Sequence, residues 1–410
     1  MDDKDELLRF LTELSSVQDL LKISFYFVGG CVRDALFGVS SDDFDIAVDG
    51  DIQTVIDYFK SRYSMKPSQF GTTSIAFGKA HVDFAEMRQE HYPDFSGLPV
   101  ISEGTLETDL KRRDFTINTG YVKFSEKAID SIVIQNKLQC ALVDLAHPYF
   151  FEDIELKKLR VLHSNAFRED ATRMLRAVKY QVMHDLTFEK GTKAQFDKGI
   201  KEGWHNDCSE NRYKKILIGY AAHQKWNEIL RKIYEWGLFQ RKDATSVSNI
   251  DSWFKQFEVL ENKIGHFDKG TVFLLLMYAT QLSYWKGASR SISAQVKTCQ
   301  TIIDEWARGL SSETLYNQLS LASNEVLAFF CMRDHGEVEI KRLVEKYVGG
   351  AGEIQLFING LDLIELGLNE GLSLGRVLKD LLKYEREHLK NLSKREELEW
   401  VERRIHEYRD

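Results

Sequence analysis

Two aspartates separated by a single residue, Asp43 and Asp45, carry the clearest chemical signal in the sequence. Residues 44–48 (FDIAV) are rich in β-branched and aromatic types and predict a short strand. Because side chains alternate along a strand, both carboxylates would point to the same face of a sheet. Neighbouring carboxylates repel each other unless a cation lies between them, and they suit Mg²⁺ that also bridges to substrate phosphates. Two such ions would activate an attacking hydroxyl and stabilise a leaving pyrophosphate; the alternative is an acidic turn in solvent.

A glycine pair precedes these aspartates at a spacing that suits a shared site. Within residues 27–38 (FVGGCVRDALFG), a strand expected over 23–28 ends before Gly29 and Gly30, and a helix is expected to begin near Val32. Glycine lets backbone N–H groups approach a ligand closely, and the start of a helix favours anions. A Gly-Gly turn is often only a turn, but beside the two aspartates it predicts a triphosphate-binding loop.

A third carboxylate is expected on a neighbouring strand. Residues 73–77 and 81–85 predict two strands joined by a turn at residues 78–79. The second of these strands contains Asp83 in an alternating stretch, and we expect it to join the first two aspartates. Glu86, which is out of phase by one position, is the alternative.

A charged cluster at residues 109–118 (DLKRRDFTIN) could bind a nucleotide. Arginines bind phosphate through paired hydrogen bonds, which suits Arg112 and Arg113. Asp114 or Asn118 could bind the ribose hydroxyls. In isolation this signal is weak, because an Arg-Arg-Asp run is usually a solvated charge cluster.

A second cluster, residues 169–173 (EDATR), lies at the expected start of a helix. Asp170 and Arg173 are three residues apart and would share one helical face. An ionised aspartate only accepts hydrogen bonds and an arginine only donates them. Together they would complement the edge that cytosine and adenine share, an exocyclic amino donor beside a ring-nitrogen acceptor. The alternative is an ion pair at a helix start with only structural value.

In order along the chain, these segments resemble the class II tRNA nucleotidyltransferase and bacterial poly(A) polymerase family. Residues 29–34 with 43–45 resemble its catalytic motif, residues 112–118 its ribose-selecting motif, and residues 169–173 its EDxxR base-recognition motif. Residues 209–212 (SENR) resemble the start of a later helical motif. The resemblance covers about half of the chain, and a fainter similarity follows near the family's tail.

The resemblance implies roles for individual residues. Asp43, Asp45 and Asp83 would be catalytic, and the first two would hold Mg²⁺. The expected nucleotide-binding residues are Gly29, Gly30, Arg33, Asp34, Arg112, Arg113, Asp114, Asn118, Asp170, Arg173, Arg176 and Arg212.

The resemblance also implies an activity. We expect CCA to be added to the 3′ end of tRNA from CTP and ATP, without a nucleic-acid template and with release of pyrophosphate. The protein would bind the acceptor arm and the 3′ end. Open alternatives are an A-adding enzyme, a CC-adding enzyme and a poly(A) polymerase, and more remotely a non-catalytic RNA-binding homologue or a transferase acting on proteins or small molecules.

Three segments bear on these alternatives. Residues 88–108 match the family's flexible loop in approximate length, and because CC-only members have a shortened loop, this favours A addition. Residues 144–153 (DLAHPYFFED) lack the glycine usual in the segment linked to interdomain motion. Lys215 stands where the later helical motif usually has a glutamate.

The positions of the prolines predict an α+β protein. All four lie within the first 148 residues, and proline is excluded from helix interiors. Helical spacing of apolar residues begins at Thr172 and continues through 213–238, 252–263, 271–284 and 293–309. We therefore expect a small mixed-sheet, polymerase-beta-like head followed by helices. The expected division is a head over 1–150, a neck over 151–235, a body over 236–350 and a tRNA-binding tail over 351–410.

Composition sets further limits. The net charge of −8 argues weakly against a nucleic-acid partner, but the basic segment 157–179 could bind RNA, with Lys157 and Lys158 as candidate contacts. No apolar run is long enough to predict a membrane span. The five scattered cysteines include no CxxC pair, which is typical of reduced thiols in a cytoplasmic protein.

Overall fold

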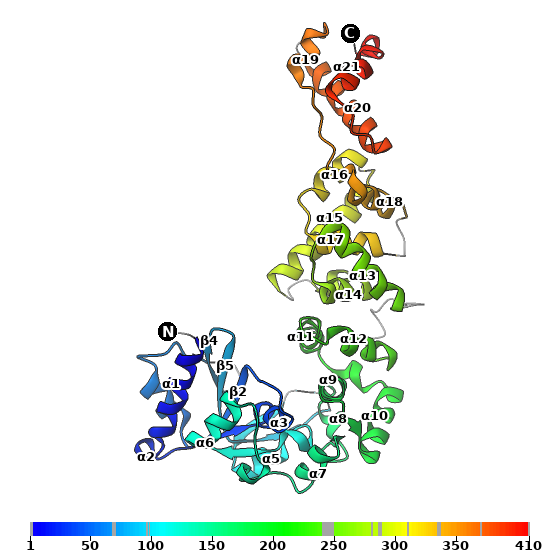
Figure 1. Cartoon of the computed structure of the whole chain (residues 1–410). Helices are drawn as coiled ribbons and strands as arrows, with labels where there is room; N and C mark the ends of the chain where they lie inside the picture. Colours follow the sequence, from blue (N-terminus) through cyan, green and yellow to red (C-terminus); the bar gives the residue numbers. More distant parts are fainter. Residues whose placement is uncertain are drawn as a thin grey trace. The chain divides into compact units, whose positions relative to one another are not determined.

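The protein divides into two units in the computed structural model. The structure describes residues 3–67, 71–95, 97, 99–239, 250–279, 282–285, 289–309, 311–333, 338–369 and 371–408. The first unit contains Met1–Tyr213 and Glu228–Gln240, and the second contains Lys214–Asn227 and Arg241–Asp410 (Figure 1). Each unit is described by itself.

A mixed sheet forms the centre of the first unit. Among the described residues it has six strands in the order β3-β4-β5-β2-β1-β8. β2 pairs parallel with β5, whereas the β1–β2, β1–β8, β3–β4 and β4–β5 pairs are antiparallel. The strands are β1 (Ser24–Val28), β2 (Asp43–Asp49), β3 (Lys66–Pro67), β4 (Thr72–Phe77), β5 (Ala80–Glu86) and β8 (Tyr121–Lys123).

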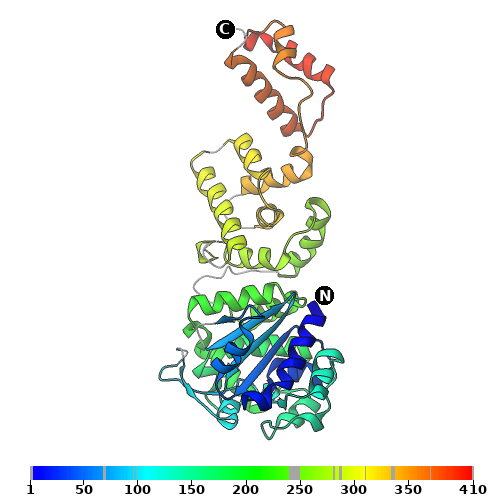
Figure 2. The same ribbon diagram turned by 90° about the vertical axis from the view of Figure 1, so that its left-hand side faces the viewer.

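One face of this sheet is covered by apolar side chains. Phe10 of α1 (Asp3–Ser16) contacts the rings of Phe77 and Phe84 on β4 and β5, with ring centroids 5.3 and 5.9 Å away. Phe44 and Ile46 of β2 belong to the same core. Figure 2 shows α1, in dark blue, beside the blue strands. Strand alternation therefore leaves the odd-numbered residues of β2 for the opposite face.

Short elements follow along the first unit. They are α2 (Gln18–Leu21), α3 (Gly30–Leu36), α4 (Ile52–Phe59), the antiparallel hairpin of β6 (Arg88–His91) and β7 (Val100–Glu103), α5 (Leu106–Lys111), the 3₁₀ turn η1 (Thr116–Asn118), α6 (Glu126–Ile129) and α7 (Phe150–Glu155). The chain then becomes mostly helical, with α8 (Ala166–Glu169), α9 (Thr172–His184), α10 (Lys190–Glu202) and most of α12 (Trp226–Glu235) in this unit. β9 (Lys158–Leu159) and β10 (Thr187–Phe188) form a short parallel pair between them. α11 (Glu210–Ala221) begins in the first unit, and most of its residues belong to the second.

The second unit is helical wherever it is described as regular structure. Its helices include α13 (Ile250–Ile264), α14 (Lys269–Met277), α15 (Arg290–Ala307), α16 (Ser312–Leu319), α17 (Asn324–Met332), α18 (Val338–Lys346), α19 (Gly360–Glu365), α20 (Leu372–His388) and α21 (Lys394–Glu402). α14 is apolar on all sides and buried from Gly270 to Met277, as expected of a central core helix. The last three helices share a small core that includes Leu363, Val377 and Val401.

The expected α+β class is confirmed: a mixed-sheet head precedes a helical remainder. The strands expected at 23–28, 44–48, 73–77 and 81–85 are present as β1, β2, β4 and β5. The segment 271–284, expected from its helical spacing, contains α14, which ends at Met277, and a 3₁₀ turn over Leu282–Trp285. The four-part division stays a prediction, since the two observed units meet within 213–241. No described helix has the length and apolar character needed to cross a bilayer.

Candidate functional site

Three carboxylates gather on the face of the sheet opposite α1. β2 and β5 run parallel in a register that pairs Asp43 with His81 and Asp45 with Asp83. Paired residues on adjacent strands point to the same face, so Asp83 lies beside Asp45. Glu86, the alternative third acid, lies in the opposite phase, and its Oε1 accepts a hydrogen bond of 2.9 Å from the backbone N–H of Ile52.

The charges of these carboxylates are not fully balanced. Burial raises the pKa of Asp45 to about 6; Arg113 opposes this shift, whereas Asp83 and Asp43 add to it. Solvent still reaches the Asp45 side chain, so protein surrounds the carboxyl group without sealing it. Excess negative charge at an open position fits a divalent cation.

Asp43 and Asp45 are the side chains that would hold such a cation. Within the described ranges, no group of three or more His, Cys, Asp or Glu side chains is arranged to hold a metal by itself. Mg²⁺ is usually bound through only one or two carboxylates, with water and substrate phosphates completing its octahedron. A two-carboxylate site open to solvent is therefore compatible with a divalent cation of this kind.

The glycine loop lies against this carboxylate group. Gly29 follows β1 with a φ of +69°, a conformation that favours glycine. A Cβ atom at this position would lie 3.0 Å from Arg113 Nη1 and 3.5 Å from Asp45 Oδ2. A side chain here would therefore crowd Arg113 and strain the backbone, whereas glycine leaves room for a ligand.

The two consecutive arginines share one acidic partner and differ in their other neighbours. Arg113 donates to Tyr121 Oη at 3.0 Å and to Asp109 Oδ2 at 3.0 Å, and it lies next to Asp45. Arg112 donates to Asp109 Oδ1 at 2.8 Å and to Glu90 of the β6–β7 hairpin at 3.2 Å. Asp109, which sequence reasoning did not select, is therefore the buried anchor of both arginines. No pattern in the sequence distinguishes it from other acids at a helix end.

The expected ribose-binding residues form a buried network with the glycine loop. Arg33 Nη1 donates to Asn118 Oδ1 at 2.7 Å, and Asn118 Nδ2 donates to Asp114 Oδ1 at 2.8 Å. Arg176 of α9 donates from Nε to Asp114 Oδ2 at 2.6 Å. Arg33 also pairs with the adjacent Asp34. These residues, all selected from the sequence, therefore lie together.

Asp170 and Arg173 do not share a helical turn as expected. α9 begins only at Thr172, and Asp170 precedes it in an extended conformation because its Oδ1 accepts from the Thr172 N–H at 3.0 Å. Asp170 is bound by Arg212, whose Nη2 lies 3.0 and 2.9 Å from its two carboxyl oxygens. Arg173 is buried and donates to the carbonyl oxygens of Ala166 and Arg112. Both side chains therefore already have partners, and not each other.

The basic segment 157–179 exposes less charge than the sequence predicts. Three of its arginines are paired with carboxylates: Arg160 with Asp153, Arg168 with Asp207 and Arg176 with Asp114. Lys157 is exposed, and Lys158 donates to Thr187 Oγ1 at 3.1 Å. Among the expected RNA contacts, Lys157 therefore has the more accessible charge.

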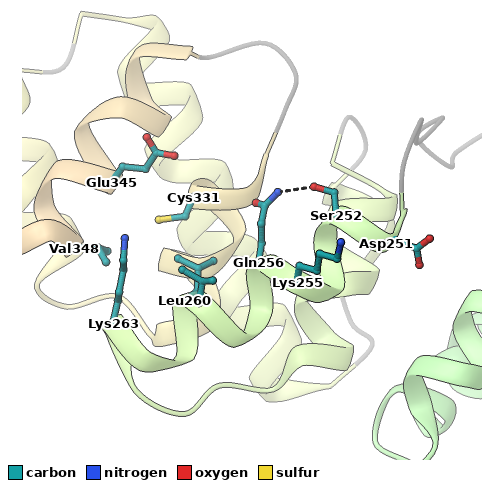
Figure 3. A pocket seen from close by; sticks show the side chains of 10 residues that line it. Asp251, Ser252, Lys255, Gln256, Leu260, Lys263, Cys331, Glu345 and Val348 are labelled. Atoms are coloured by element: carbon teal, nitrogen blue, oxygen red, sulfur yellow. Dashed lines mark hydrogen bonds between the residues drawn. The ribbon is translucent and has the colours of Figure 1, made fainter.

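A separate cavity of about 650 Å³ lies in the second unit and contains none of these residues. α13 provides most of its lining, including Lys255 and Lys263, and Cys331 and Glu345 lie across from it (Figure 3). Gln256 Nε2 donates to Ser252 Oγ at 3.0 Å along α13. Lysines and acids both line this cavity, so the lining does not favour a ligand of one particular charge.

Comparison with known proteins agrees with this geometry. Residues 25–141 match the family described as poly A polymerase head domain. An A-adding tRNA nucleotidyltransferase of Geobacter sulfurreducens is 26% identical over 409 residues, covering 91% of this chain and 44% of that protein. An enzyme of the same name from Halalkalibacterium halodurans is 24% identical over 384 residues, covering 88% of this chain and 84% of that protein. The chain thus spans less than half of the Geobacter relative's length.

A solved structure shares the fold over nearly the whole chain. The Thermotoga maritima CCA-adding enzyme complexed with tRNA aligns with a TM-score of 0.66 at 21% identity, covering 98% of this chain and 96% of that one. The glycine loop and the sheet carboxylates both lie within the residues that match the poly A polymerase head domain. Residues 25–141 thus contain a poly A polymerase head domain, and the chain as a whole is similar to A-adding tRNA nucleotidyltransferases.

Proposed function

We propose that this protein adds CCA to the 3′ end of tRNA, using CTP and ATP and no nucleic-acid template. The observation that carries the proposal is the alignment of Asp45 with Asp83 on the sheet face that also bears Asp43, directly beside Gly29 and Arg113. The names of the relatives supply the acceptor class, and the tRNA complex of the T. maritima enzyme supports it.

The residues divide the chemistry between them. Mg²⁺ bound by Asp43 and Asp45 would activate the 3′ hydroxyl and stabilise the leaving pyrophosphate. Asp83 adds negative charge beside Asp45 and strengthens the preference for a divalent cation. Arg113 presents positive charge at the same recess, where it would bind phosphate oxygens. The glycine loop leaves the space into which a triphosphate fits.

Base selection is assigned to Asp170 and Arg173. After its bonds to Thr172 and Arg212, Asp170 Oδ2 still has a lone pair that can accept from the exocyclic amino group of cytosine or adenine. Arg173 has donors beyond the two that it gives to backbone carbonyls. Uracil and guanine would leave a carbonyl facing the aspartate, and each such mismatch costs about 1–3 kcal/mol at a desolvated site.

A second candidate is the addition of A alone. It is favoured by the names of the Geobacter and Halalkalibacterium relatives, both A-adding enzymes. The β6–β7 hairpin lies near the base-recognition residues, with the ring of Tyr92 5.8 Å from the Arg173 guanidinium. A loop in this position could bias the site toward one base.

The carboxylate assignment is tested by two isosteric variants. Asp43→Asn and Asp45→Asn should each abolish nucleotide incorporation, because an amide cannot replace an anionic ligand of Mg²⁺. RNA binding should persist, since it depends mainly on phosphate contacts elsewhere. Incorporation by a labelled-nucleotide assay and RNA affinity by filter binding measure the two properties.

The matched control is Asp49→Asn, which removes an exposed carboxylate from the end of the same strand. It should retain wild-type incorporation. Near-normal incorporation by the Asp43→Asn/Asp45→Asn double variant would overturn the assignment.

A further inference from the structure

The last residue of α9, His184, touches the helix of the glycine loop. Its Nε2 lies 3.2 Å from Asp34 Oδ1, and its ring stacks on Phe37 with a centroid distance of 4.8 Å and an interplanar angle of 22°. The side chain is 1% exposed. A histidine from the helical part of the first unit is thus packed directly against the glycine-loop helix.

The partner of His184 is itself the partner of a proposed nucleotide ligand. Arg33 Nε donates to the same Asp34 oxygen at 2.8 Å, and Arg33 Nη1 donates to Asn118. Asn118 and Arg176 both donate to Asp114. A continuous path of polar contacts therefore leaves α9 at its last residue and returns to α9 at Arg176, two turns earlier.

Burial makes each contact in this path important. Asp34 and Arg33 are 7% and 4% exposed, and buried charges are stable only when they are paired and hydrogen-bonded. Burial alone would raise the pKa of Asp34, but the contact with His184 and the charge of Arg33 outweigh it and lower that pKa. Asp34 is therefore ionised at neutral pH, and it needs donors on both sides.

The environment of His184 determines which nitrogen carries its proton. Burial lowers the pKa of His184, and the neighbouring cations Arg33 and Lys179 act in the same direction, so the ring is neutral at neutral pH. Among the described residues neither Nδ1 nor Nε2 has a partner in hydrogen-bond geometry, but Nε2 lies 3.2 Å from Asp34 Oδ1. The single proton is thus stabilised at Nε2, where Asp34 can accept it. A small ring rotation would align the 3.2 Å contact as a hydrogen bond.

We infer that His184 is a positioning residue of the nucleotide site, which fixes Asp34 and thereby holds Arg33 against Asn118. This inference rests on the proposed function, in which Arg33, Asp114 and Asn118 bind the nucleotide. His184 does not touch the nucleotide; it acts through Asp34. Loss of its donor would let the Arg33 guanidinium rotate and would weaken nucleotide binding more than the chemical step.

Two substitutions separate the hydrogen bond from packing. His184→Leu fills a similar volume without a donor, whereas His184→Gln offers an amide N–H near the position of Nε2. The leucine variant should raise the nucleotide KM about tenfold with kcat nearly unchanged, and the glutamine variant should restore KM to near the wild-type value. Phe37→Leu is the control, because it removes the stacked ring and leaves the donor.

The measurements are KM and kcat for single-nucleotide incorporation, equilibrium binding of CTP and ATP by calorimetry, and the melting temperature of each variant. A wild-type KM in His184→Leu would overturn the inference. An equal rise of the nucleotide KM in the His184→Leu, His184→Gln and Phe37→Leu variants would also overturn the inference, because packing would then explain the effect. If the wild-type protein binds nucleotide without extending RNA, and His184→Leu weakens that binding, the proposed function fails while the positioning role stands.

Discussion

At the scale of single residues, Arg212 fixes the orientation of the Asp170 carboxylate. Arg212 Nη2 lies 3.0 and 2.9 Å from the two carboxyl oxygens of Asp170, which is only 14% exposed, so this contact fixes the orientation of the carboxylate. Removal of one side of a partly buried, hydrogen-bonded pair leaves the other charge without its partner. Base recognition should therefore depend on a residue that does not itself have to contact the base.

Replacement of Arg212 should impair base selection. In Arg212→Ala the Asp170 carboxylate loses its fixed orientation, so kcat/KM for CTP and ATP should fall by roughly 10–100-fold, and their advantage over UTP and GTP should narrow. Arg212→Lys keeps the positive charge but not the guanidinium geometry, and its effect should lie between those of the wild-type protein and Arg212→Ala. Incorporation assays with all four nucleotides measure both effects.

Arg168→Ala is the matched control, because Arg168 forms a comparable ion pair with Asp207 in the same helical region. It should leave selectivity unchanged. If Arg212→Ala keeps wild-type rates and selectivity, then Arg212 does not hold Asp170 for base recognition.

The sequence predicts the central residues of the site but not their anchors. Asp43 and Asp45 are recognisable because strand alternation fixes their shared face from local spacing alone. Asp109 and His184 are not recognisable, since their partners lie on other elements and depend on tertiary packing. Asp170 and Arg173 were predicted to share one helical face. This is wrong, because α9 begins only at Thr172, whose backbone N–H donates to the Asp170 side chain.

At the scale of elements, the C-terminal helices contain a buried pair of acids. Glu385 of α20 and Glu397 of α21 are both fully buried. Glu397 accepts hydrogen bonds from the backbone N–H groups of Phe357 and Ile358, which stabilise its charge. Burial raises the pKa of Glu385 to about 7, and the proximity of Glu397 adds to the shift. Glu385 is therefore the member of the pair that holds a proton in the folded state.

The stability of these helices should fall as the pH rises from about 4.5 to 7. In this window the folded state keeps a proton on Glu385 that the unfolded chain releases, so the free energy of unfolding decreases with pH. Glu385→Gln should remove this dependence and slow backbone exchange in α20 and α21 above pH 7. Hydrogen–deuterium exchange, corrected for the intrinsic effect of pH on exchange, measures the stability of α20 and α21 at each pH.

Glu399→Gln is the control, because Glu399 lies on α21 in a more exposed pair with Arg395. The Glu399→Gln variant should keep the wild-type pH dependence of the stability of α20 and α21. If the protection of α20 and α21 from hydrogen exchange is constant from pH 4.5 to 8 in the wild-type protein, then Glu385 does not hold a proton in the folded state as proposed.

Most elements follow from local patterns, and the exceptions have physical causes. The strand pairs and the helix from Thr172 were predicted from alternation and helical spacing. The end of α14 at Met277 was not predicted, because the helical spacing of apolar residues continues past it. β9 and β10 were missed because two-residue strands carry no periodicity.

At the scale of the whole molecule, the proposed binding of tRNA by a chain of net charge −8 requires local basic surfaces. Lys157 is exposed, while three arginines of the same segment are already paired. Removing positive charge that contacts phosphate reduces the salt dependence of binding, by about 0.7–0.9 in slope per contact.

The Lys157→Ala/Lys158→Ala variant should therefore bind tRNA more weakly, with a log–log salt slope reduced by roughly 1–2. Affinity measured from low to physiological salt tests this. Lys193→Ala/Lys198→Ala on α10, where both lysines pair with acids on their own helix, should leave the slope unchanged. An unchanged slope in the first variant would locate the RNA contacts elsewhere, the C-terminal helices being the next candidates.

The central claim is that the site adds C and then A to an RNA end with no nucleic-acid template. The most direct measurement incubates three tRNA transcripts, ending in the discriminator base, in C or in CC, with labelled CTP and ATP, followed by sequencing of the products. Full CCA addition predicts that all three transcripts are completed to CCA and not extended further. Extension of only the CC-ending transcript, by a single A, would show an A-adding enzyme, and failure to extend any of them would contradict the account.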